Sequence, residues 1–212
     1  MKNQLILSLP KLSKKLNLTV IQNPVDFGDI KSKSKENIGR LKDKRYLVAA
    51  GRLVPAKGFD ILIDAFHNIS GQFHDLELII LGAGKDKENL EQKRNLLGME
   101  NIITFPGYVT NVYPYFKEAD ACVLSSRIEG FPNVLLQMMS QNTKAVATLS
   151  AGDIENIPGI FTCKPGNPEE LSAAIKNCLL SNTDVNRSVF DDYLKGRTQE
   201  MFYSKIMEQI KS

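Results

Sequence analysis

The chain has 212 residues, of which 42% are hydrophobic and 24% are charged, proportions that indicate a soluble globular protein and exclude a disordered or fibrous one. The 27 basic and 24 acidic residues leave a net charge of only +3. This balance argues against a nucleic-acid partner, because nucleic-acid-binding domains usually cluster Lys and Arg on one face.

Short β-branched runs, which predict strands, alternate along the chain with amphipathic segments. The predicted strands are Thr19–Gln22, Tyr46–Ala50, Glu77–Leu81, Ile102–Phe105, Ala121–Ser125, Ala145–Thr148 and Ile160–Cys163. Helices are predicted from apolar residues at three- and four-residue spacing, over Phe59–Ile69 and Leu171–Leu179. Because strands separated by such helices form right-handed crossovers, the sequence predicts an α/β fold with a Rossmann-like, doubly wound parallel sheet.

The two ends of the chain differ from this middle part. Pro24 marks a boundary turn, so we expect residues 1–18 to be a remnant of a preceding region or a linker. A domain is expected over residues 19–185, with the basic stretch Lys31–Arg45 as a solvated loop. Residues 186–212 are expected to form a C-terminal helical segment, since Val189–Ile210 has helical spacing. Its packing partner is not evident within the chain.

Cysteine usage and hydropathy indicate the compartment. Cys122, Cys163 and Cys178 have spacings that match neither a zinc site nor a disulfide framework, so we expect reduced core residues. No apolar run approaches the roughly 18 residues that would span a bilayer, and the N-terminal residues lack the features of a signal peptide. The sequence therefore predicts a cytoplasmic protein, with at most peripheral contact at the inner face of a membrane.

The loops that follow the strands hold the candidate site, because doubly wound sheets bind ligands beyond the carboxyl ends of their strands. The first such loop, Gly51–Gly58, presents Arg52 and Lys57 between a strand and a helix. Two cations near a helix N-terminus suit a diphosphate. Two unrelated surface cations are the alternative interpretation.

The loops after the second and third strands carry weaker signals. Gly82 and Gly84 follow the second strand, and glycines allow close approach of a ligand to the backbone. The spacing fits neither a complete dinucleotide-binding fingerprint nor a phosphate-binding P-loop, so a plain tight turn is an equally good interpretation. Val109 is the candidate in the loop after the third strand.

The segment Ser125–Gln137 carries the most specific pattern. Glu129 is expected to accept hydrogen bonds from sugar hydroxyls, while Gly130 and Pro132 prepare a helix start whose N–H groups face the same crevice. Gln137 lies two turns further along that helix, on roughly the same side, where it can reach a ribose.

These segments, read in order, resemble a known family. The motifs G-R-L-x-x-x-K-G-F-D, L-G-x-G, S-R-x-E-G-F-P-N-V-L-L and P-G-N-P-E-E-L are similar to those of the group 1 retaining glycosyltransferases, which include glycogen and sucrose synthases. The resemblance covers roughly Val20–Leu180 and implies the C-terminal, donor-binding half of a GT-B fold. It implies that Arg52 and Lys57 hold the diphosphate and that Glu129 holds the donor sugar, as the catalytic residues. The other candidate donor-binding residues are Gly51, Gly82, Gly84, Val109, Arg127, Gly130, Phe131, Pro132, Asn133, Val134, Leu135 and Gln137.

Two features depart from the family pattern. The family commonly has a second glutamate eight residues after the first, where this chain has Gln137, so an acceptor-only ribose contact becomes an amide with one acceptor and two donors. The family's N-terminal acceptor domain is also missing from this sequence, which implies that a missing domain or a partner chain supplies it.

The resemblance implies hexosyl transfer with retention from a UDP- or GDP-linked sugar to a glycan or lipid-linked acceptor, in polysaccharide, lipopolysaccharide or glycoconjugate biosynthesis. No cofactor or metal is expected, because the sequence has no Asp-x-Asp motif and no cluster of His or Cys ligands. The alternative is a non-catalytic nucleotide-sugar-binding module or a truncated half that needs a partner. A sugar-nucleotide epimerase is a weaker alternative, since it needs acid-base carboxylates and a histidine in the cleft.

Overall fold

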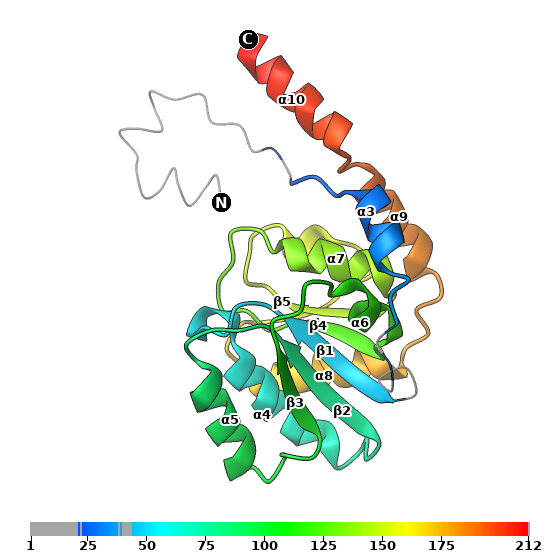
Figure 1. The fold of residues 1–212 in the computed structure, drawn as a ribbon. Coiled ribbons are helices and arrows are strands. Elements are labelled where there is room, and N and C mark those ends of the chain that lie inside the picture. The colour runs from blue at the N-terminus through cyan, green and yellow to red at the C-terminus, as the bar shows by residue number, and fades with distance from the viewer. Residues whose placement is uncertain (1–20, 22, 38, 40–43, 212) are drawn as a thin grey trace.

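A computed structural model of the chain describes residues 21, 23–37, 39 and 44–211. Its sheet consists of β1 (Arg45–Ala50), β2 (Leu76–Leu81), β3 (Ile103–Gly107), β4 (Ala121–Leu124), β5 (Ala145–Thr148) and β6 (Phe161–Cys163). All neighbouring strands are parallel, in the order β3-β2-β1-β4-β5-β6. This is the doubly wound order in which the direction of winding reverses between β1 and β4, so the predicted fold class is confirmed (Figure 1).

Helices cover both faces of the sheet. They are α3 (Phe27–Lys33), α4 (Phe59–Ser70), α5 (Lys87–Leu96), α6 (Tyr113–Glu118), α7 (Asn133–Gln141), α8 (Pro168–Leu180), α9 (Asn186–Lys195) and α10 (Gln199–Lys211). Helices α4, α5 and α8 pack on one face, and α6, α7 and α9 pack on the other, with α3 beside α6. Two short 3-10 turns, η2 (Pro55–Lys57) and η3 (Ile154–Asn156), lie in the loops after β1 and β5.

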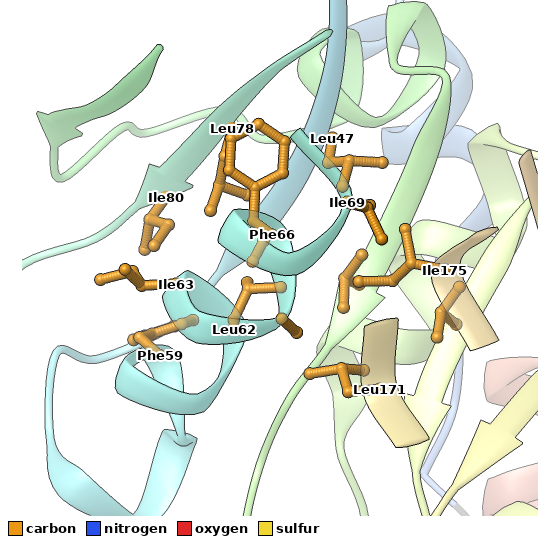
Figure 2. Close-up of a cluster of buried hydrophobic side chains, with 14 of the residues drawn as sticks. Leu47, Phe59, Leu62, Ile63, Phe66, Ile69, Leu78, Ile80, Leu171 and Ile175 are labelled. Atoms are coloured by element: carbon orange, nitrogen blue, oxygen red, sulfur yellow. The ribbon is translucent and has the colours of Figure 1, made fainter. Parts of the chain in front are cut away.

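The predicted apolar face of α4 fills the core between this helix and the sheet. Figure 2 shows Phe59, Leu62 and Phe66 of α4 pointing toward the strands, among the other buried side chains of that layer. Strand β1 serves both layers, because successive side chains of a strand point to opposite faces: Leu47 belongs to this core, and Val48 to the core under α6 and α7.

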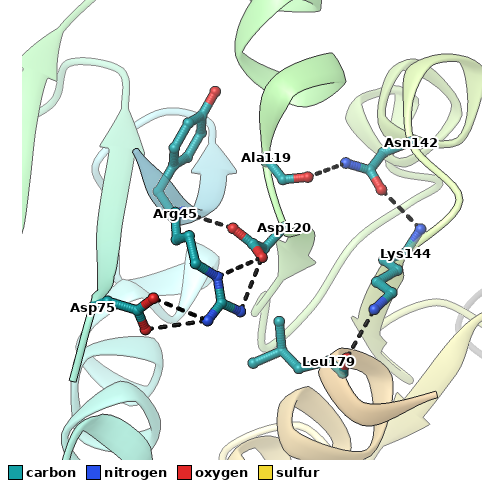
Figure 3. Close-up of polar contacts among 8 residues, drawn as sticks. Arg45, Asp75, Ala119, Asp120, Asn142, Lys144 and Leu179 are labelled. Atoms are coloured by element: carbon teal, nitrogen blue, oxygen red, sulfur yellow. Dashed lines mark hydrogen bonds and ion pairs between the residues drawn. The ribbon is translucent and has the colours of Figure 1, made fainter. Parts of the chain in front are cut away.

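The amino ends of the strands are held by a polar network that lies away from the candidate site. Arg45, the first residue of β1, donates to Asp120 Oδ1 from Nε and Nη2 at 3.1 Å, and to Asp75 from Nη1 at 3.1 and 3.2 Å (Figure 3). Lys144 donates to the carbonyl oxygen of Leu179 at 2.8 Å and so joins the start of β5 to the end of α8. These contacts fix strand positions at the edge opposite to where doubly wound sheets bind ligands.

The C-terminal segment consists of two helices with different surroundings. Phe190 and Leu194 of α9 are fully buried in the core under α7, so this helix packs against the domain itself, contrary to the expectation that no partner is evident. Helix α10 extends away from the body (Figure 1) and exposes Met201, Tyr203 and Ile210.

The segment Lys31–Arg45, expected to be a solvated loop, is partly helical, since Lys31–Lys33 form the last turn of α3. The strand predicted at residues 19–22 lies outside the described residues except for Ile21, which is not in a strand. The three cysteines are buried free thiols, as predicted. In the described part of the chain, no helix is both long enough and apolar enough to cross a membrane.

Candidate functional site

A cleft of about 460 Å³ opens at the carboxyl ends of the central strands. It is built from the loops after β1, β2, β3 and β4 together with the first turns of α7. Eleven of the predicted site residues line it: Gly51, Arg52, Lys57, Gly82, Val109, Glu129, Phe131, Pro132, Asn133, Val134 and Gln137. Four segments that are far apart in the sequence thus meet where the strand order reverses, the usual ligand position of this topology.

Four other predicted donor-binding residues do not line this cleft. Leu135 is fully buried in the core, because it lies on the sheet-facing side of α7. Gly130 is exposed to solvent. Gly84 packs against backbone, since a Cβ there would lie 2.2 Å from the carbonyl oxygen of Leu53. Arg127 points away from the cleft and pairs with Asp60.

Five further residues line the cleft without being predicted from the sequence: Ala50, Leu81, Ala83, Tyr108 and Val112. Tyr108 follows β3 directly, and its side chain is 77% exposed at the cleft. Tyr108 could have been predicted from the sequence, because it lies in the loop at the end of a predicted strand, one residue before Val109.

Lys57 and Glu129 contact each other inside the cleft. The Nζ of Lys57 donates to Oε1 of Glu129, and Ser126 Oγ donates to the same oxygen at 2.6 Å. Both charged side chains are mostly buried, with 19% and 12% exposed. The stem of Lys57 runs past Gly51, where an added Cβ would lie 3.5 Å from Cε of the lysine. The site therefore holds a desolvated cation and a desolvated carboxylate within one contact of each other.

Arg52 differs from Lys57 in that no described residue is paired with its head group. It is exposed and lines the same cleft. Among the described residues it forms no ion pair or side-chain hydrogen bond. Its guanidinium is available to an anion, and guanidinium groups bind phosphates with bidentate geometry.

The glycines after β1 and β2 let two loops approach each other. Gly82 has φ of 138°, and a Cβ there would lie 1.8 Å from the carbonyl oxygen of Gly51. Only glycine fits such a conformation and such a contact. The tight-turn interpretation thus accounts for Gly82 and Gly84 by backbone packing, while Gly82 also borders the cleft.

The N-terminus of α7 faces the cleft with polar groups. Pro132 is its N-cap, and no side chain of the described residues caps the first turn. Free N–H groups at a helix start attract anions. The side chain of Asn133 accepts a hydrogen bond from Asn23 Nδ2 at 2.6 Å, and Gln137 Nε2 lies 3.4 Å from the hydroxyl oxygen of Tyr113.

The described residues include no group of three or more His, Cys, Asp or Glu side chains placed to hold a metal ion. His67 and His74 are exposed surface residues. The cleft offers two cations, one carboxylate, the amides of Asn133 and Gln137 and a helix N-terminus. This set suits a diphosphate joined to hydroxyl-rich groups.

The chain is similar in sequence to known proteins. A family model described as "Glycosyl transferases group 1" matches residues 44–181. A lipopolysaccharide core biosynthesis glycosyltransferase of Rhizobium meliloti is 30% identical over 138 residues, which are 65% of this chain and 39% of that protein. The N-acetylgalactosamine-N,N'-diacetylbacillosaminyl-diphospho-undecaprenol 4-alpha-N-acetylgalactosaminyltransferase of Campylobacter jejuni is 32% identical over 129 residues, 61% of this chain and 34% of that protein.

Solved structures support the fold. Anabaena HepE, crystallised with UDP, superposes with a TM-score of 0.78 at 24% identity, over 91% of this chain and 57% of that one. TarM of S. aureus superposes with a TM-score of 0.80 at 16% identity, over 97% of this chain and 42% of that one. The chain thus spans about half or less of the length of the relatives it matches in sequence.

Proposed function

The chain belongs to the group 1 glycosyltransferases, and we propose that it carries the donor site of an enzyme that transfers a hexosyl group, with retention, from a UDP- or GDP-linked sugar. One observation carries this proposal: Arg52, Lys57 and Glu129 line a single cleft with the N-terminus of α7. Cations and helix N–H groups suit a diphosphate, and a carboxylate suits sugar hydroxyls.

The chemistry follows from where charge develops. When the bond between the anomeric carbon and the diphosphate breaks, negative charge collects on the leaving phosphate and positive charge on the sugar ring. Arg52, Lys57 and the N-terminus of α7 stabilise the first charge, in the manner of preorganised electrostatic catalysis. Lys57 is paired with Glu129, so a bound diphosphate competes with that carboxylate for the ammonium group. Glu129 is then able to turn to the donor sugar.

We propose an acceptor that is a glycan or a lipid-linked glycan in polysaccharide, lipopolysaccharide or glycoconjugate biosynthesis. The support is that two relatives are named for a lipopolysaccharide core and for a diphospho-undecaprenol-linked glycan. With such an acceptor, the protein works in the cytoplasm with at most peripheral membrane contact. Because this chain spans 39% and 34% of those relatives, we propose that an N-terminal domain or a partner chain binds the acceptor.

The experiment has two parts. Titration calorimetry with UDP and GDP measures donor-site binding by the 212-residue chain. A transfer assay with a lipid-linked acceptor is then run with and without an added acceptor domain. We expect binding in the first part and turnover only with the added domain, because orienting the acceptor and excluding water are each worth several kcal/mol of barrier. Nucleotide binding without turnover, either with or without the added domain, favours the non-catalytic module. Absence of nucleotide binding contradicts the donor site.

A further inference from the structure

The turn that carries Lys57 is attached along its whole length to the segment that leads to Glu129. The turn is η2 with Gly58, residues 55–58, and the segment is residues 125–127 at the end of β4. The carbonyl oxygen of Ala56 accepts from the N–H of Arg127 at 2.8 Å. The carbonyl oxygen of Lys57 accepts from Ser125 Oγ at 2.9 Å. The backbone of the turn therefore faces residues 125–127, which leaves the side chain of Lys57 to the cleft.

The turn also packs against this segment at Gly58, which has φ of 62° and leads into α4. A Cβ on Gly58 would lie 2.2 Å from the carbonyl oxygen of Ser125. Glycine is thus required both by the backbone conformation and by the neighbouring strand end.

Arg127 closes this attachment with its side chain. Its Nη1 donates to the carbonyl oxygen of Pro55 at 2.7 Å and to Asp60 Oδ1 at 2.7 Å, while Nη2 donates to Asp60 Oδ2 at 2.6 Å. Such a bidentate pair fixes orientation as well as distance. Partial burial raises the pKa of the Asp60 carboxyl. The hydrogen bonds and charge of Arg127, together with the backbone N–H groups of Asp60 and Ile61, outweigh this effect and hold that pKa below its usual value. The pair is ionised at neutral pH.

Asp60 belongs to the first turn of α4, and Arg127 lies two residues before Glu129. The pair therefore joins the element that places Lys57 to the loop that places Glu129, from outside the cleft. We propose that Arg127 and Asp60 are positioning residues of the donor site, which hold the turn of Lys57 against the loop of Glu129 and so set the spacing between the diphosphate and sugar contacts. This inference rests on the proposed donor-binding function.

The test is a double-mutant cycle on UDP binding. Wild type, Arg127→Ala, Lys57→Ala and the double variant are titrated with UDP. We expect Arg127→Ala to weaken binding roughly threefold to tenfold, within the range of coupling between residues of one network. If Arg127 acts through Lys57, the double variant binds no more weakly than Lys57→Ala alone. An equal fold-loss with and without Lys57, or no loss in the single variant, overturns the positioning role.

The ion pair between Lys93 of α5 and Asp64 of α4 provides a matched control. Lys93 pairs with Asp64 of α4 at 2.7 Å, with side-chain exposures of 32% and 33%, close to the 37% and 34% of Arg127 and Asp60. Lys93→Ala removes a similar ion pair without touching the turn, so UDP affinity is expected to stay at the wild-type value. A loss in this control equal to that of Arg127→Ala means that any α4 ion pair has the same effect, and the specific role is overturned.

A second measurement needs no nucleotide. Lys57 is 19% exposed and paired with Glu129, so acetic anhydride acetylates it slowly, as mass spectrometry would measure. We expect several-fold faster acetylation of Lys57 in Arg127→Ala and no change in Lys93→Ala. An unchanged rate overturns the positioning role by itself. Wild type that binds neither UDP nor GDP contradicts the proposed function, whatever the acetylation result.

Discussion

Lys57 and Glu129 are 72 residues apart in the chain and form an ion pair within the candidate cleft. The lysine comes from the turn after β1 and the glutamate from the loop after β4, the two strands between which the order of the sheet reverses. Each group is the other's counter-ion, so removing one leaves the other mostly buried without its partner. The predictions for this pair follow from that relationship.

Substitution of either cation should weaken nucleotide binding. We expect Arg52→Ala or Lys57→Ala to cost about 1.5–3 kcal/mol of UDP binding, the range for a hydrogen bond to a charged group. Titration calorimetry measures this loss. Lys85→Ala is the control, because Lys85 is exposed in the neighbouring loop and does not line the cleft. Unchanged affinity in both cation variants would remove these residues from the site.

Glu129→Gln should weaken binding of the nucleotide sugar without weakening binding of the free nucleotide. The free nucleotide is expected to bind at least as tightly as to wild type, since Lys57 no longer has a competing carboxylate. The binding free energy that the sugar adds to that of the nucleotide should fall by about 1.5–3 kcal/mol, because a charged acceptor is lost. The comparison is between UDP and UDP-glucose or UDP-N-acetylglucosamine. Equal losses for UDP and its sugar derivatives would be inconsistent with a contact to the sugar.

Gln137→Glu restores the second glutamate of the family pattern. Gln137 lines the cleft 3.4 Å from the hydroxyl oxygen of Tyr113, which is able to donate to a carboxylate at that position. We expect UDP affinity to rise by about 0.5–1.5 kcal/mol from an added hydrogen bond to the ribose. A UDP analogue without ribose hydroxyls is the control and should show no gain. The same gain for both ligands would place Gln137 away from the ribose.

Gly82→Ala should destabilise the domain. The φ of 138° at Gly82 strains any other residue, and an added Cβ would lie 1.8 Å from the carbonyl oxygen of Gly51 and overlap with it. We expect the free energy of unfolding to fall by about 2–4 kcal/mol. Urea denaturation measures this change. Gly71→Ala is the control, since Gly71 has φ of −68° and open space around its Cα. Similar stabilities of the two variants would refute this account of Gly82.

The cysteines should be unreactive in the folded protein. Burial raises the pKa of Cys163 to about 11 and that of Cys178 to about 12, and burial also raises the pKa of Cys122. At pH 8 only about one Cys163 thiol in a thousand is ionised, and the thiolate is the reactive form. We expect Ellman's reagent to label none of the three in native buffer and all three in guanidinium chloride. Rapid labelling of native protein would show that a thiol is accessible.

The fold class and the position of the candidate cleft could be predicted from the sequence alone. Strand and helix periodicities predicted β1 to β6 within about a residue or two at most ends, and parallel topology then brings the loops after the strands to one edge. Arg52, Lys57 and Glu129 were identified for this reason: each follows a predicted strand, and the structure places all three in one cleft. The same periodicity predicted a helical C-terminal segment without its break between α9 and α10.

The directions of individual side chains could not be predicted from the sequence. Arg127 lies two residues before Glu129, yet its guanidinium leaves the cleft to pair with Asp60. Gly84 packs against Leu53 instead of bordering the cleft, and Phe190 buries α9 against its own domain. Each outcome depends on contacts between segments far apart in the chain and on turn conformations such as that of Gly58. Periodicity along one segment carries no information on such contacts, because they form only when the sheet brings the segments together.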